Sequence, residues 1–193
     1  MNNKLLSSLA TVLFSMASLA LADNPVYNPT TDFTVEKGNP NGVWSYGWIP
    51  NDVQKFTLHS TPYPVESTTP AWFTPGCKDN NPQIWRNLGK KTLLGVAVGQ
   101  LALHPGCQYE PSVLRWTAPI DGQYQIKGKF LAGDGGSMRI GIKQADQWLW
   151  KARDAGKFNL TTTITVGSPI DFIVYGGYDY GTTPLEVTIT PIE

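Results

Sequence analysis

The sequence predicts an all-β fold, an antiparallel β-sandwich of the jelly-roll kind, with little or no helix outside the N-terminal leader. Segments in which apolar and polar residues alternate recur along the chain, whereas a helical period of 3.6 is almost absent. Glycine, proline, asparagine and aspartate separate these segments, as turn residues do. Roughly ten segments with one apolar and one polar face suit two packed antiparallel sheets.

The N-terminal segment 1–22 is predicted to be a signal peptide. Lys4 precedes an apolar run that ends in Ala20-Leu21-Ala22, which matches the charged start, apolar centre and small-residue cleavage site of an export signal. We therefore expect residues 23–193 to form a single β-sandwich domain that is secreted, extracellular or periplasmic. A retained membrane anchor is the weaker alternative, because the run is short for a span.

The charge balance argues against two classes of partner. Lys and Arg total 15, and Asp and Glu also total 15. A balanced charge gives no electrostatic reason to expect nucleic acid or an anionic membrane as a partner. Seven Trp, eight Tyr and seven Phe among few charges suit a turn-rich β protein and argue against disorder.

The first aromatic segment, "NGVWSYGWIP" at 41–50, places Trp44, Tyr46 and Trp48 on one face of a strand. Such a row is either a platform for a flat ligand or a wall of the core. The opposite face carries Val43 and mostly small residues, so we favour the core.

Residues 60–91 are rich in proline and show little alternation, which predicts a long excursion from the sheets. Cys77 lies within it, and Cys107 lies in a second turn-like segment. An even pair of cysteines in an exported chain predicts a disulfide bond between them.

From Ser112 onward, strands are predicted to follow one another with short turns. In the segment 112–117, Trp116 should face inward and Arg115 outward, where we expect Arg115 to contribute little to stability. The later segments 122–130, 137–143, 157–166 and 184–190 alternate in the same way. Their expected inward residues are Tyr124, Ile126 and Phe130, then Met138, Ile140 and Ile142, then Phe158, Leu160, Ile164 and Val166, and finally Leu185, Val187 and Ile189.

Catalytic and metal motifs are weak. The two histidines lack zinc-ligand spacing, and no G-x-S-x-G nucleophile elbow occurs. Asp134 in "GDGGS" raises the possibility of a structural calcium ion, but one acid is poor provision for a cation that takes six or more oxygens. We expect no cofactor and no catalytic residue, with an enzyme as the less favoured alternative.

The candidate ligand-binding residues are aromatic side chains that a core does not need, together with polar neighbours. Indole and phenol rings stack on sugar faces, and amide or charged groups take the hydroxyls. In "QWLWK", either Leu149 or the two Trp residues face the core, and both readings stay open. The predicted set is Trp85 and Arg86 on the excursion, Trp148 and Trp150 on a strand, and Tyr178, Asp179 and Tyr180 in a turn-rich loop.

Three segments resemble a known family. They are "NPNGVWSYGW" at 39–48, "LALHPG" at 101–106 and "SVLRWTAPIDGQYQIKGKF" at 112–130. Their residues and order are similar to exported bacterial jelly-roll modules found in proteins with a PEP-CTERM sorting tag. The resemblance implies a β-sandwich similar to galactose-binding and carbohydrate-binding modules. The family has no assigned activity that could be transferred to this chain. The sorting tag is absent here, so we expect a released protein, and the cysteine pair is a further departure.

The sequence therefore predicts an exported, non-catalytic binding module whose partner is a glycan or another extracellular ligand, with no membrane insertion. Two alternatives stay open: an enzyme that degrades extracellular polysaccharide, as hydrolase or lyase, and a structural or adhesive protein of the envelope or matrix. The sugar and the oligomeric state are not indicated.

Overall fold

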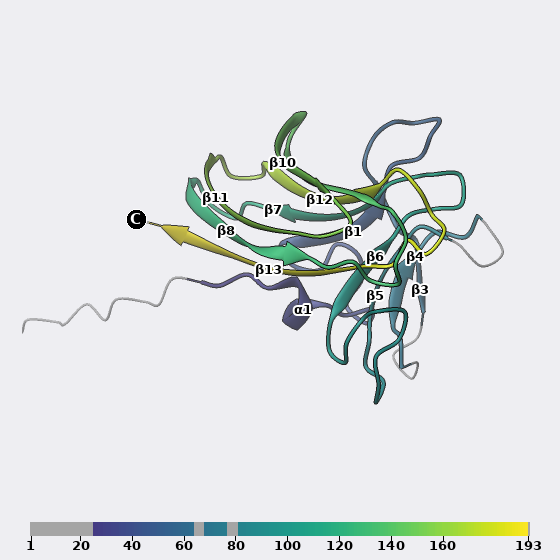
Figure 1. Cartoon of the computed structure of the whole chain (residues 1–193). Coiled ribbons are helices and arrows are strands. Elements are labelled where there is room, and N and C mark those ends of the chain that lie inside the picture. Colours follow the sequence, from purple (N-terminus) through teal and green to yellow (C-terminus); the bar gives the residue numbers. More distant parts are fainter. Residues whose placement is uncertain (1–24, 64–67, 77–80, 193) are drawn as a thin grey trace, which may run out of the picture.

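The computed structural model describes residues 25–63, 68–76 and 81–192, and it confirms the antiparallel β-sandwich (Figure 1). A six-stranded sheet and a seven-stranded sheet enclose one large apolar core. The first has the order β10 (Gln147–Arg153), β9 (Arg139–Gln144), β12 (Pro169–Tyr175), β7 (Ser112–Thr117), β1 (Trp44–Trp48) and β2 (Thr57–Leu58). The second has the order β11 (Gly156–Ile164), β8 (Gly122–Phe130), β13 (Thr183–Ile192), β6 (Leu101–His104), β5 (Gln83–Arg86), β4 (Ala71–Phe73) and β3 (Thr61–Tyr63).

A single helical turn, α1 (Pro29–Asp32), precedes the strands. Its N-cap is Asn28, whose side-chain oxygen accepts a hydrogen bond from the Thr30 amide at 2.9 Å. At its other end, an Asp32 carboxylate oxygen accepts a hydrogen bond from Trp44 Nε1 at 2.9 Å. The turn therefore ties the N-terminal segment to the first core strand.

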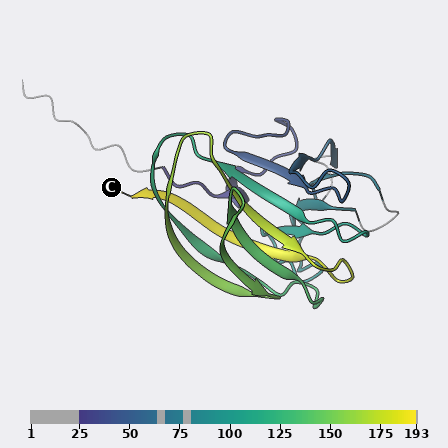
Figure 2. The same ribbon diagram turned by 90° about the horizontal axis from the view of Figure 1, so that it is seen from above.

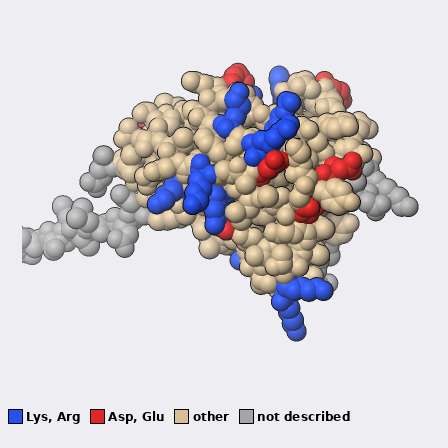
Figure 3. All heavy atoms as spheres, in the orientation of Figure 1, with Lys and Arg blue, Asp and Glu red and all other residues tan. Residues whose placement is uncertain are grey.

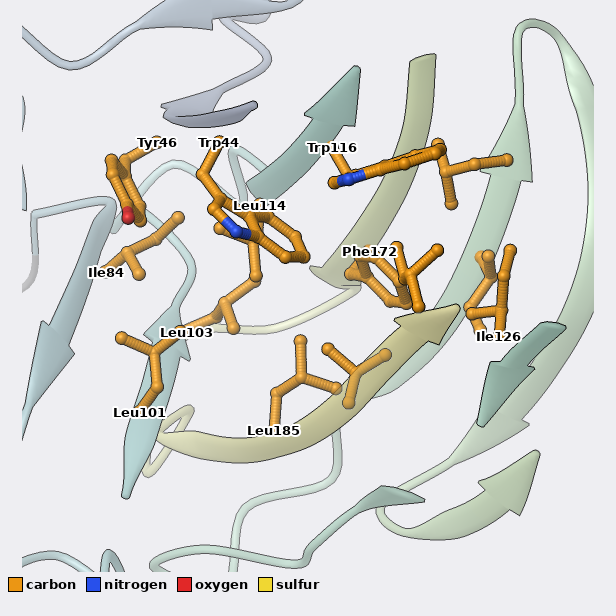
Figure 4. Close-up of a cluster of buried hydrophobic side chains, with 14 of the residues drawn as sticks. Trp44, Tyr46, Ile84, Leu101, Leu103, Leu114, Trp116, Ile126, Phe172 and Leu185 are labelled. Atoms are coloured by element: carbon orange, nitrogen blue, oxygen red, sulfur yellow. The ribbon is translucent and has the colours of Figure 1, made fainter. Parts of the chain in front are cut away.

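The first two aromatic residues of β1 form part of the core, as predicted. Trp44 is 1% exposed and Tyr46 is 0% exposed. Both lie among the buried side chains drawn in Figure 4, which also include Trp116 from β7. Trp116 packs edge to face on Tyr124 with ring centroids 4.9 Å apart. Trp48, at the end of the strand, is half-buried.

The long strands of the C-terminal half, in green and yellow in Figure 2, follow the predicted alternation. Of the residues expected to face inward, Leu160 is only partly buried. The prediction for Val166 is wrong, because this side chain is 59% exposed. Strand β11 ends at Ile164, and a turn follows in which the Ser168 amide donates to the Thr165 carbonyl. Val166 lies in this turn, where strand alternation no longer applies.

The segment 60–91, predicted as a long excursion with little alternation, contains three short strands that the sequence pattern did not indicate. Strands β3, β4 and β5 extend the seven-stranded sheet beyond β6. They have three or four residues each, which is too short for alternation to be visible. Pro62 fits because β3 is the edge strand, where a missing amide donor costs no ladder hydrogen bond.

Two predictions lie outside the described residues. The signal peptide 1–22 is one, and Cys77 of the cysteine pair is the other, so the bridge to Cys107 stays a prediction. Within the described residues, no helix is long and apolar enough to cross a membrane.

Candidate functional site

A β-bulge in β10 separates the two tryptophans of "QWLWK" onto opposite faces. The register with β9 shifts between Trp148 and Trp150. Trp150 turns toward the core, where its ring lies parallel to Phe130 at 6.0 Å and tilted against Phe158 at 5.4 Å. Leu149 also packs against the core. Trp148 alone stands on the outer face, an arrangement that neither sequence reading described.

The Trp148 indole lies against the sheet on Gly141 of β9. A Cβ at Gly141 would be 2.4 Å from the ring, so any other residue there would push the indole away. Tyr175 stacks beside it with centroids 5.6 Å apart and an interplanar angle of 25°. The ammonium groups of Lys143 and Lys151 lie 4.7 and 5.7 Å from the ring centroid. We call this group, Trp148 with Tyr175 and the two lysines, the Trp148 platform.

A row of charged side chains continues from the platform across the same outer face. In the strand register, Trp148 is opposite Lys143, Lys143 is opposite Asp171, and Asp171 is opposite Arg115. The Arg115 guanidinium donates two hydrogen bonds to Asp171, from Nε at 2.7 Å and from Nη2 at 2.8 Å. This bidentate pairing fixes both side chains in position.

The far end of the row is closed by Phe56. The Arg115 guanidinium carbon lies 3.9 Å from the centroid of the Phe56 ring. That ring lies on Gly47 of β1, where a Cβ would be 2.6 Å from it. A second aromatic ring therefore lies against a glycine of the sheet, as Trp148 does.

A hollow of about 400 Å³ lies beside this row, and we call it the Arg115 hollow. It combines an aromatic wall, a fixed ion pair, and cationic and anionic side chains on one rim. Such a combination offers a flat apolar surface and hydrogen-bonding groups of both kinds, which is what a sugar ring requires. Its lining includes Phe56, Arg115, Lys143, Asp146 and Asp171.

The structure does not bring Trp85 and Arg86 into this site. Trp85 lies on the outer face of the seven-stranded sheet, is 4% exposed, and forms a small separate cluster with Ala71, Val96 and Ala102. Arg86 follows it on the strand and so faces the other way, where its Nε donates to the Gly99 carbonyl at 3.1 Å. These contacts give both residues a structural role in packing and hydrogen bonding.

Tyr178, Asp179 and Tyr180 lie in the loop between β12 and β13. Tyr178 is half-buried and meets Tyr109 edge to face at 5.5 Å. Tyr180 is 72% exposed. The loop begins directly after Tyr175, which belongs to the Trp148 platform. Its tip is open to solvent.

Asp134, the residue behind the calcium alternative, lies near Thr182 and His104. Burial raises the pKa of the Asp134 carboxyl, and burial lowers the pKa of His104. His104 Nδ1 donates to the Pro105 carbonyl at 2.6 Å. In the part of the chain that the structure describes, no group of three His, Cys, Asp or Glu is arranged to hold a metal ion.

Sequence reasoning missed Phe56, Lys143 and Asp171 as members of one site. Alternation correctly put Arg115 on the outer face, but it did not predict the two hydrogen bonds that Arg115 donates to Asp171. Its partner Asp171 is nearly buried and 56 residues away, and alternation within one strand contains no information about such a partner.

Comparison with known proteins adds little. No family model and no curated protein matches the chain, so the resemblance to sorting-tagged modules stays a prediction. Among solved structures, the chain resembles a family 35 carbohydrate-binding module from Clostridium thermocellum, with 11% identity and a TM-score of 0.36 over 51% of this chain and 84% of that one. It resembles a carbohydrate-binding module from Cellvibrio mixtus lichenase 5A, solved with cellotriose, with 14% identity and a TM-score of 0.27 over 70% and 92%. The enzymatically active domain of bacteriophage CBA120 tailspike protein 4 matches with 10% identity and a TM-score of 0.36 over 84% of this chain and 22% of that one. At these scores none of the three carries an argument about function.

Proposed function

We propose that this protein is an exported, non-catalytic carbohydrate-binding module, and that its site is the outer face of the six-stranded sheet. The observation that carries the proposal is the position of Trp148, a half-buried indole that lies against Gly141, next to a hollow lined by charged side chains. A sugar ring stacked on the indole would place its hydroxyls beside Lys143 and the Arg115 hollow.

The two parts of the site have different roles. The indole contributes apolar contact with the C–H face of the sugar, and by analogy with bases stacked on aromatics we expect about 1–3 kcal/mol from it. Lys143 and Asp146 give orientation, because one donates and the other accepts hydrogen bonds. Arg115 and Asp171 already satisfy each other, so they act as a rigid floor.

Binding is expected to be weak, because one ring face is stacked and water competes for each hydroxyl. We expect dissociation constants of about 0.01–1 mM. The test is a glycan-array screen followed by calorimetric titration of the best oligosaccharide. Trp148→Ala should weaken binding by roughly tenfold or more. Tyr180→Ala is the matched control, since Tyr180 is an exposed aromatic outside the site.

Three results would contradict the proposal. Binding that is lost in Tyr180→Ala and kept in Trp148→Ala would move the site to the loop. Release of reducing sugar from a bound polysaccharide would favour the enzyme alternative. If no glycan binds below about 10 mM, the adhesive, protein-binding alternative takes first place.

A further inference from the structure

A second groove lies on the opposite outer face of the molecule, on the seven-stranded sheet. It has a volume of about 1070 Å³ and runs over β11, β8 and β13. Its lining also includes Asn28 and Thr30 of the N-terminal segment and residues 98–100 before β6. Figure 3 shows basic side chains gathered over β8 and β11 on this face. We call it the lysine groove.

Three lysines and one glutamate line the groove, a net charge of two positive. In the strand register, Lys157 lies directly opposite Lys129, and Lys129 lies directly opposite Glu186. Lys127 is two residues from Lys129 on β8 and so shares its face, about 7 Å along the strand.

The single acid of the groove is already occupied. Lys129 Nζ lies 2.9 Å from one Glu186 carboxylate oxygen, and Gln100 Nε2 donates to the other at 2.6 Å. Lys127 and Lys157 have no ion-pair partner among the described residues. Two exposed ammonium groups therefore face the groove without a counter-charge.

This arrangement is unfavourable for the sheet alone. Like charges directly opposite each other on neighbouring strands destabilise the pair, and an exposed position such as Lys157 does not require lysine. The whole chain has equal numbers of basic and acidic residues. The excess of positive charge in the groove is therefore not a consequence of a high overall content of lysine and arginine. An anionic ligand laid across the three strands would supply the missing charge.

We propose that the lysine groove binds a polysaccharide that carries an anionic group on successive sugars. The lysines match the repeated charge, while Asn159 and Thr188, which lie opposite Lys127 in the register, offer hydrogen bonds to hydroxyls. Single-stranded nucleic acid is the less suitable polyanion, because it needs exposed aromatic rings for its bases and the one aromatic residue of the lining, Phe158, is 5% exposed. The groove shares no lining residue with the Trp148 platform, so either site can fail without the other.

The test uses oligomers of polygalacturonate, their fully methyl-esterified form, and a single-stranded oligonucleotide of similar charge. Calorimetric titration should detect the free acid and not the ester. Raising the salt from about 20 mM to about 500 mM should weaken binding roughly tenfold, because the groove is open to solvent and its charges are screened. The double variant Lys127→Ala/Lys157→Ala should lose about tenfold or more. Lys90→Ala/Lys91→Ala removes two exposed lysines outside the groove and should bind like the parent.

Thermal melting separates binding from folding. Lys157→Ala should keep or raise the Tm, since it removes a like-charge contact, while it weakens binding of the free acid. Equal binding of acid and ester, unchanged binding in the double variant, or preference for the oligonucleotide would each overturn the proposal. Loss of neutral-glycan binding in Trp148→Ala bears on the first site alone.

Discussion

Removing the guanidinium of Arg115 tests whether the outer face is a rigid floor. The Asp171 side chain is 9% exposed and accepts two hydrogen bonds from Arg115, at 2.7 and 2.8 Å. Breaking a fully buried pair costs about 3–5 kcal/mol, because the remaining charge is left without a partner. The Arg115 side chain is 26% exposed, so water reaches part of this site, and we discount the cost to about 2 kcal/mol.

The assay is a double-mutant cycle followed by urea unfolding. Arg115→Ala and Asp171→Ala should each lower the free energy of unfolding, and the double variant should lose less than the sum, with a coupling of about 1–2 kcal/mol. Lys151→Ala is the control on the same outer face. A loss below about 0.5 kcal/mol for Arg115→Ala, or additive single effects, would refute the reasoning.

Three further predictions concern the core, the pH dependence and the cysteines. Trp116→Ala should destabilise the protein by about 3–5 kcal/mol in urea unfolding, because a fully buried indole is removed, and a loss under about 1 kcal/mol would contradict its place in the core. Burial lowers the pKa of His59 to about 3, so the folded state keeps the ring neutral while the unfolded state takes up a proton below about pH 6.5. Stability should therefore fall by about 1.4 kcal/mol per unit as the pH drops from about 6 to 4, and His59→Gln should lack that part of the slope; identical slopes would argue against the assignment. Alkylation and mass measurement with and without reductant should show Cys77 and Cys107 joined in exported protein, and two alkylated thiols without reductant would disprove the bridge.

The faces of the strands were predictable where alternation ran for six residues or more. Trp116 and Arg115 were placed on their correct faces because apolar and polar residues alternate through 112–117, and burial dominates that choice. The same reasoning failed at β3, β4 and β5, which have three or four residues each. Strands that short gain their stability from neighbours in the sheet, and those neighbours are distant in sequence.

The candidate site was less predictable, since it depends on register and on a bulge. Nothing in "QWLWK" indicates that the strand contains a bulge. The register shift at that bulge is what places Trp148 and Trp150 on opposite faces of the sheet. The ion pair across β7 and β12 depends on how two strands align, which local pattern does not contain. The sequence did indicate the residue types of the site, aromatic rings with charged neighbours, and it named one of them, Trp148.

The proposed glycan site lies on the outer face of the six-stranded sheet. Hydroxyl-radical footprinting with and without the best glycan from the screen tests it most directly, because it locates the ligand without a substitution. We expect oxidation of Trp148 and Phe56 to fall when the ligand is bound, while oxidation of Tyr180 and Tyr63, both exposed elsewhere, should not change. Protection of Tyr180 or Tyr63 with Trp148 still oxidised at its free rate would contradict it.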